Sequence, residues 1–66
     1  MAQKIIEVVG ISTESFDKAA ENALQEAAKT VRGIKWVRIR GLEMAVSETK
    51  VIQYRATARI YFDVQH

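Results

Sequence analysis

The stretch from Val51 to Val64 constrains the fold most, because apolar and polar residues alternate along it with hardly any interruption. Alternation with a period of two is typical of a β-strand with one buried and one exposed face. The predicted core side consists of Ile52, Tyr54, Ala56, Ala58, Ile60, Phe62 and Val64. The opposite side carries Gln53, Arg55, Thr57, Arg59, Tyr61 and Asp63.

A second strand is predicted from about Ile34 to Val46, and its apolar residues change parity at Gly41. One inserted residue, a β-bulge, produces such a change. With that bulge, the face away from the core carries Trp36, Arg38, Arg40, Glu43 and Ala45. The polar segment 47–50 has the length of a hairpin connection, although it lacks the usual Gly.

The first part of the chain predicts a strand and then a helix. The segment Lys4–Gly10 is rich in β-branched residues and has apolar side chains on both faces, which predicts that both faces are at least partly covered. In the helix, Ser12 or Thr13 can cap the N-terminus and Gly33 is a natural stop. The predicted apolar face of the helix consists of Phe16, Ala20, Ala23, Leu24, Ala27 and Val31. The β-α-β-β order predicts an α+β fold in which a three-stranded antiparallel sheet wraps around one helix.

Residues 1–66 are expected to form a single small domain that associates with copies of itself. A chain this short buries only roughly 60% of the surface that its unfolded form exposes, so it needs a further source of stability. Disulfides are excluded because there is no Cys, and a lone histidine, His66, argues against a structural zinc site. No apolar run approaches the about 18 residues of a membrane span and no signal peptide is apparent, so a cytoplasmic location away from membranes is predicted.

Trp36 is the candidate functional residue, because an indole is costly to leave in water and here shares a strand face with arginines. One hypothesis is a subunit contact, since aromatics and Arg are both enriched at interfaces. The other is a stacking platform for a flat ligand, with Arg and Gln side chains supplying hydrogen bonds. The two hypotheses are compatible, because a chain this small offers only a shallow surface and a deep pocket would have to form between copies.

Two other classes of function are disfavoured. Single-strand nucleic-acid binders stack bases on several aromatics along a cationic groove, whereas this chain has a net charge of only +2 and one aromatic clearly within the basic face. The sequence shows no nucleophile with a base to activate it, as catalysis would require. The hydroxyl residues Ser12, Thr13 and Ser15 are explained by helix capping. We therefore predict neither an enzyme nor a nucleic-acid-binding protein.

The ordered segments "EVVGIS", "SFDKAAENAL", "KTVRGIKWV" and "YRATARIYFDV" resemble the dodecins over nearly the whole chain. The resemblance implies a hollow homododecamer that stores or sequesters flavin and quenches its photochemistry. It also implies that flavins stack in pairs between the indoles of symmetry-related subunits, with Trp36 at the stacking position. The expected cofactor is therefore riboflavin or FMN.

Two positions depart from the pattern of the flavin-binding dodecins. Where those proteins carry Gln after the third-strand aromatic, this chain has Arg55, which donates hydrogen bonds but cannot accept one from the flavin ring N–H. Where many bacterial members that bind FMN carry Arg, this chain has Glu43, which would repel a phosphate. Glu43 or Gln53 can replace the missing acceptor, and Arg38 completes the expected site. Alternatively, Glu43 and Arg55 pair and close the site, which leaves a shell with a structural or storage role or a different small ligand. If flavin binds, riboflavin is expected to be preferred over FMN.

Overall fold

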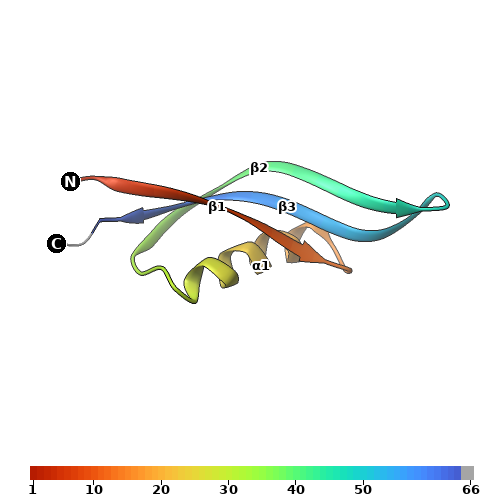
Figure 1. Cartoon of the computed structure of the whole chain (residues 1–66), viewed down its shortest axis with the longest axis horizontal. Coiled ribbons are helices and arrows are strands. Elements are labelled where there is room, and N and C mark those ends of the chain that lie inside the picture. The colour runs from red at the N-terminus through yellow and green to blue at the C-terminus, as the bar shows by residue number, and fades with distance from the viewer. Residues whose placement is uncertain (65–66) are drawn as a thin grey trace.

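The computed structural model describes residues 1–64, so His66 lies outside the described part of the chain. It contains the strand β1 (Gln3–Ser12), the helix α1 (Phe16–Ala28) and the strands β2 (Ile34–Ser47) and β3 (Lys50–Asp63) (Figure 1). The three strands form one sheet in the order β1-β3-β2, and both neighbouring pairs are antiparallel. The predicted β-α-β-β fold, with one helix on one face of a three-stranded sheet, is confirmed.

The β2–β3 pair contains the bulge that the parity change predicted. Ile39 faces Ala58 and Gly41 faces Thr57, so Arg40 is the additional residue on β2. The pairing register shifts again between Ile34 and Trp36, and between Ala45 and Val46. Because the bulge absorbs one residue, the apolar positions of β2 stay on the helix side of the sheet on both sides of Gly41.

The helix begins three residues later than a cap at Ser12 predicts, and two residues later than a cap at Thr13 predicts. Its N-cap is Ser15, whose hydroxyl oxygen accepts a hydrogen bond from the backbone N–H of Lys18 at 3.0 Å. Ser12 is buried instead, and its hydroxyl accepts from the backbone N–H of Glu14 at 2.9 Å. Both serines satisfy backbone donors, but Ser12 does so in the turn that leaves β1.

The helix also ends earlier than predicted, at Ala28, so Val31 is not part of it. Gly33 has a positive φ of 75° and lies in the loop before β2, where its carbonyl accepts from the backbone N–H of Asp63 at 3.1 Å. Gly33 is therefore the last residue of the loop between α1 and β2 and does not terminate the helix. Within residues 1–64, no helix has the length and apolar character needed to cross a bilayer.

The core between the helix and the sheet is made mostly of small residues. Its fully or nearly fully buried apolar members are Ala19, Ala23, Ala27, Ala56, Ala58 and Ile60. Ile6, Val8, Ile34 and Val37 pack against the edge of this cluster. A Cβ atom added at Gly10 would lie 1.9 Å from the carbonyl oxygen of Ala19, so β1 and the helix backbone are in close contact. Ala19 was absent from the predicted helix face, although it makes this contact.

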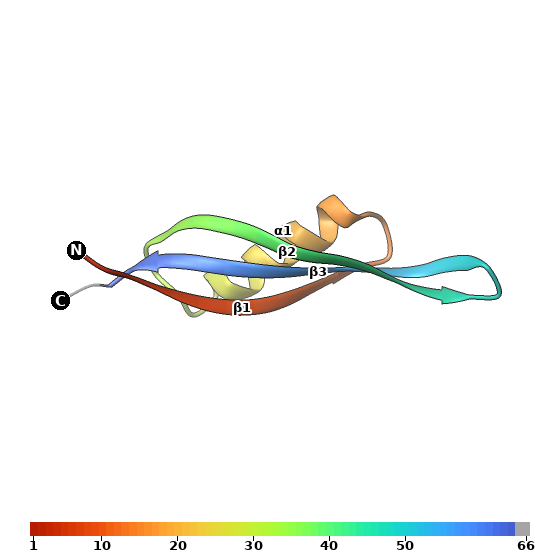
Figure 2. The same cartoon turned by 90° about the horizontal axis from the view of Figure 1, so that it is seen from above.

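The helix covers only part of the sheet. At about 1.5 Å per residue the 13-residue helix spans about 20 Å, whereas a 14-residue strand spans about 46 Å. The far part of β2 and β3 therefore projects past α1, and the long axis of the chain measures 51 Å (Figures 1 and 2). We call this projection the hairpin end; its large apolar residues, between 41% and 57% exposed, are Leu42, Met44, Val46, Val51 and Ile52.

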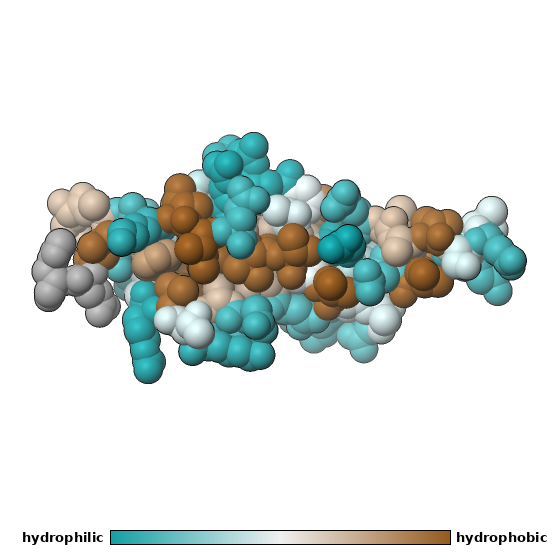
Figure 3. All heavy atoms as spheres, viewed as in Figure 1, coloured by the Kyte–Doolittle hydropathy of each residue, from teal (hydrophilic) through white to brown (hydrophobic). Residues whose placement is uncertain are grey.

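Some apolar side chains that the sequence predicts to be covered are thus exposed to solvent in the single chain. Ile52 was predicted for the core but is 56% exposed, because α1 does not reach it. On the outer face of β1, Ile5, Val9 and Ile11 are 44% to 48% exposed, which leaves the predicted cover of that face to another molecule. Figure 3 shows apolar side chains gathered in a band along β1 and again at the hairpin end.

Candidate functional site

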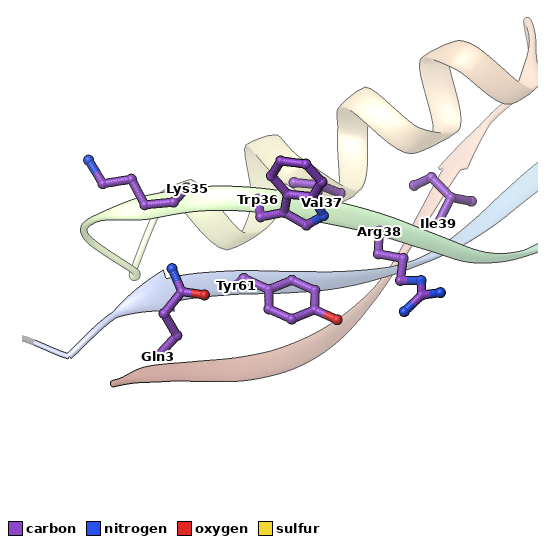
Figure 4. A pocket seen from close by; sticks show the side chains of 7 residues that line it. All are labelled: Gln3, Lys35, Trp36, Val37, Arg38, Ile39 and Tyr61. Atoms are coloured by element: carbon purple, nitrogen blue, oxygen red, sulfur yellow. The ribbon is translucent and has the colours of Figure 1, made fainter. Parts of the chain in front are cut away.

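Trp36 lies near the start of β2 on the sheet face that α1 does not cover, and 67% of it is exposed. The register places it opposite Tyr61 of β3, which is in turn opposite Ile5 of β1. Beside the indole is a shallow, open concavity of about 720 Å³, which we call the Trp36 pocket (Figure 4). Its lining residues are Gln3, Lys35, Trp36, Val37, Arg38, Ile39 and Tyr61.

The pocket combines flat aromatic surface with hydrogen-bonding side chains from three strands. In Figure 4 the indole stands over β2, whereas the ring of Tyr61 lies over β3 with its hydroxyl toward Arg38. Gln3 reaches in from β1, and its side-chain Nε2 donates to Oδ1 of Asp63 at 2.9 Å. Such a site can stack a planar molecule and contact the polar groups on its edge.

The charge beside the pocket is positive. Arg38 faces Arg59 across the strands, and like charges in that position are destabilising. The Nε atom of Arg59 lies 3.3 Å from a carboxylate oxygen of Glu7, which offsets one of these charges. Lys35 and Arg38 have no carboxylate within 4.0 Å among residues 1–64. The pocket is therefore rimmed by cations that an acidic neighbour or an anionic ligand would stabilise.

Three of the predicted site residues lie elsewhere. Glu43 faces Arg55 and Gln53 faces Ala45 near the end of the β2–β3 hairpin, and we call Glu43, Gln53 and Arg55 the hairpin cluster. Arg55 is six residues from Tyr61 along β3, a separation of about 20 Å. Within one chain, the structure thus brings Trp36 and Arg38 together but keeps the hairpin cluster apart from them.

The alternative in which Glu43 pairs with Arg55 and closes the site is compatible with the strand register. The two residues are direct cross-strand neighbours, yet no nitrogen–oxygen contact within 4.0 Å joins them in the described residues. The part of the chain that the structure describes also contains no group of three or more His, Cys, Asp or Glu residues that could hold a metal ion.

Gln3, Lys35 and Tyr61 line the pocket but were not among the predicted site residues. Tyr61 could have been found, because the alternation of its strand already placed it on the outer face with Trp36. Gln3 could not, since the sequence does not reveal that β1 pairs with β3 and not with β2. Lys35 sits at the register shift between Ile34 and Trp36, where alternation fails.

A three-stranded sheet around one helix, with an exposed indole beside an open pocket of ligand size, defines a small α+β protein with a candidate surface binding site. The family model described as Dodecin matches residues 2–65. The dodecin of Thermus thermophilus is 29% identical over 62 residues, covering 94% of this chain and 90% of that protein. The calcium dodecin of Mycobacterium tuberculosis is 32% identical over 62 residues, covering 94% and 87%. The chain belongs to the dodecin family.

Solved dodecin structures share the whole architecture. A crystal structure of an arginine-to-alanine variant of T. thermophilus dodecin superposes with a TM-score of 0.93 at 28% identity, covering 98% of this chain and 97% of that chain. The structure of M. tuberculosis calcium dodecin gives a TM-score of 0.84 at 31% identity, covering 98% and 93%. The Streptomyces davaonensis dodecin, at 18% identity, has the same fold with a TM-score of 0.93.

Proposed function

We propose that this protein binds and stores flavin, riboflavin or FMN, by stacking the ring system on Trp36 between copies of the chain. The observation that carries the proposal is the exposed indole beside the Trp36 pocket in a chain of the dodecin family. An indole exposed to this extent is unfavourable in water, and a flat aromatic ligand would cover it. The proposed role is binding and not catalysis, and a cytoplasmic location stays a prediction.

A homo-oligomer, and by the family resemblance a dodecamer, is part of this proposal. Among residues 1–64 the core holds one large fully buried side chain, Ile60, while apolar residues of β1 and of the hairpin end lie exposed. Exposed apolar surface of this kind is a common sign of an interface. Other copies of the chain are the proposed cover, since a core built mainly from alanine gives little stability by itself.

The separation of the two clusters supports a site shared between copies. A flavin on Trp36 would meet Glu43, Gln53 or Arg55 only if another copy brought its hairpin cluster to the pocket, because about 20 Å separates them within one chain. In that arrangement Arg55 would donate to a flavin carbonyl, and Glu43 and Gln53 would be candidate acceptors for a ring N–H. The negative charge of Glu43 would then disfavour a phosphate, so riboflavin is expected to bind more tightly than FMN.

The alternative is a dodecin shell without flavin. Its supporting observation is the direct cross-strand position of Glu43 and Arg55, which allows the two side chains to pair and withdraw from a ligand. The name of the M. tuberculosis relative, calcium dodecin, associates that protein with a different ligand. A purified protein that stays a large oligomer and binds neither flavin would favour this alternative.

The test is a titration of riboflavin and of FMN followed by flavin fluorescence. We expect strong quenching with the native protein, because an indole stacked on an excited flavin transfers an electron to it. Trp36→Ala should abolish the quenching, while Trp36→Phe keeps a flat ring and serves as the matched control for stacking without the indole. The oligomer size of Trp36→Ala should equal that of the native protein. An unquenched titration of both flavins would contradict the proposal, and dissociation of Trp36→Ala would assign Trp36 to the subunit contact instead.

A further inference from the structure

We infer that the amide oxygen of Gln3 is the hydrogen-bond acceptor for the ring N–H of the ligand in the Trp36 pocket. This inference rests on the proposed function and names the chemistry that the pocket recognises, a planar ring with an imide edge. It gives β1 a role in the binding site that neither the resemblance nor the sequence pattern assigned to it.

The position of Gln3 follows from the sheet order. Because β1 lies beside β3, Gln3 faces Asp63 and occupies the outer face with Tyr61 and Trp36. Gln3 is a diagonal neighbour of Tyr61, within reach of a long side chain. Gln3 is two strand spacings from Trp36, about 10 Å, and two residues along the strand, about 7 Å, so the two backbones are about 12 Å apart. A fused three-ring system and the side chain of Gln3 can span this distance together. A ring stacked on the indole can therefore present its edge to Gln3.

The orientation of the amide follows from its partner. Asp63 is a carboxylate and can only accept, so the nitrogen of Gln3 must face it, and Nε2 donates to Oδ1 at 2.9 Å. This bond leaves the carbonyl oxygen of Gln3 without a hydrogen-bond partner among residues 1–64. In Figure 4 that oxygen points along the pocket toward Tyr61. Asp63 thus holds Gln3 with its acceptor directed at the site.

The other polar groups of the pocket complement this acceptor. Lys35 and Arg38 donate only, and the hydroxyl of Tyr61 can donate as well. An imide edge presents two carbonyl acceptors on either side of one N–H donor. The pocket offers one acceptor, the oxygen of Gln3, together with several donors, and this arrangement complements the imide edge. Gln3 can thus fill the acceptor role that Arg55 cannot, and from the same chain that supplies the indole.

The experiment compares riboflavin with riboflavin methylated at its imide nitrogen, which keeps the stacking surface but lacks the N–H. Dissociation constants of both flavins are measured for the native protein and for Gln3→Met, which keeps the length of the side chain and removes the acceptor. We expect the native protein to bind riboflavin about tenfold more tightly than the methylated flavin, the usual contribution of one such hydrogen bond. In Gln3→Met this ratio should fall to about one.

Two further variants distinguish the amide oxygen of Gln3 from the carboxylate of Glu43 as the acceptor. Asp63→Asn introduces an amide that can itself donate to the oxygen of Gln3 and so occupy the acceptor. This variant should therefore also lower the ratio of the affinities for riboflavin and the methylated flavin, although Gln3 is unchanged. Glu43→Met removes the carboxylate acceptor of Glu43 while keeping the length of the side chain, and it should leave the ratio near its native value. Light scattering measures the particle size of each variant. A size equal to that of the native protein shows that assembly is retained.

The outcomes are distinguishable. If the native protein binds no flavin, both the proposed function and this inference are contradicted. If it binds riboflavin and discriminates against the methylated flavin equally well in Gln3→Met, the inference alone is overturned. Loss of discrimination in Glu43→Met together with native behaviour of Gln3→Met would move the acceptor to the hairpin cluster.

Discussion

Beneath α1 the helix-facing side of the sheet is sealed by alanines, whereas at the hairpin end the same face of β2 and β3 is bare (Figures 1 and 2). The covered half allows a very close approach of helix and strand, as Gly10 and Ala19 show. The hairpin end carries larger apolar side chains, such as Leu42 and Met44, which are 55% and 50% exposed. The difference supports the proposal that one half of the fold is completed within the chain and the other half by another copy.

The largest expected effect comes from crowding the covered half. Gly10→Ala places a Cβ atom 1.9 Å from the carbonyl oxygen of Ala19 and 2.5 Å from the backbone nitrogen of Ala23, so the helix must move away from β1. We expect a loss of about 3 kcal/mol or more in the free energy of unfolding, at the upper end for overpacked sites.

Gly41→Ala is the matched control, because a Cβ at that position meets nothing within 4 Å. Its free energy of unfolding should change by less than about 0.5 kcal/mol, because the added methyl group has open space around it. Thermal or denaturant unfolding of the two variants side by side makes the comparison. Equal effects at Gly10 and Gly41 would contradict the close helix–strand contact.

The next effect concerns the hairpin end. Leu42→Asp places a negative charge at a position on the hairpin end. The side chain of Leu42 is 55% exposed within one chain, and we propose that another copy buries it. Burial of a leucine stabilises by about 1.5–3 kcal/mol, and an unpaired buried charge adds a further penalty, so the oligomer should dissociate or lose much of its stability.

Analytical ultracentrifugation at several concentrations measures this loss of assembly. The control is Lys50→Gln at the first residue of β3, which should leave the particle size unchanged. If Leu42→Asp assembles like the native protein, then the hairpin end is not an interface, and the bare half of the sheet is not completed by another copy.

The smallest effect lies in the turn that joins β2 to β3. Glu48 and Thr49 both have positive φ, at 48° and 70°, as in a two-residue type I′ turn, in which Asn and Gly are preferred. The double variant Glu48→Asn, Thr49→Gly should raise the free energy of unfolding by about 1 kcal/mol, because left-handed backbone disfavours side chains such as that of Thr.

Denaturant unfolding of the double variant, next to the single change Glu48→Gln, measures this gain. A stability loss in the double variant would mean that the side chains of Glu48 or Thr49 make contacts, for instance with a neighbouring copy, that outweigh the backbone strain.

Much of the fold was predictable from local patterns. The alternation from Val51 to Val64 and the parity change at Gly41 predicted the long strands and the bulge, because both depend only on the geometry of the backbone. The helix ends were harder to predict, since Ser12, Thr13 and Ser15 all carry capping hydroxyls and the sequence does not rank them. Ile52 was misplaced because alternation predicts which side a residue faces but not whether anything covers that side.

The candidate site was predictable only in part. Trp36 and Arg38 follow from strand parity, and the structure brings them together in one pocket. The contribution of Gln3 depends on which strands are neighbours, a long-range property that no local pattern contains. The separation of Glu43, Gln53 and Arg55 from Trp36 likewise appears only once the register is known, and it is this separation that points to a second copy.

The most direct test of a flavin site completed between copies is size-exclusion chromatography of the native protein after incubation with riboflavin, with absorbance followed in both the ultraviolet and the blue. We predict that the blue flavin band travels with a particle much larger than one chain and is absent from the same particle of Trp36→Ala. Riboflavin that elutes only as the free compound, or together with a single chain, would contradict such a shared site.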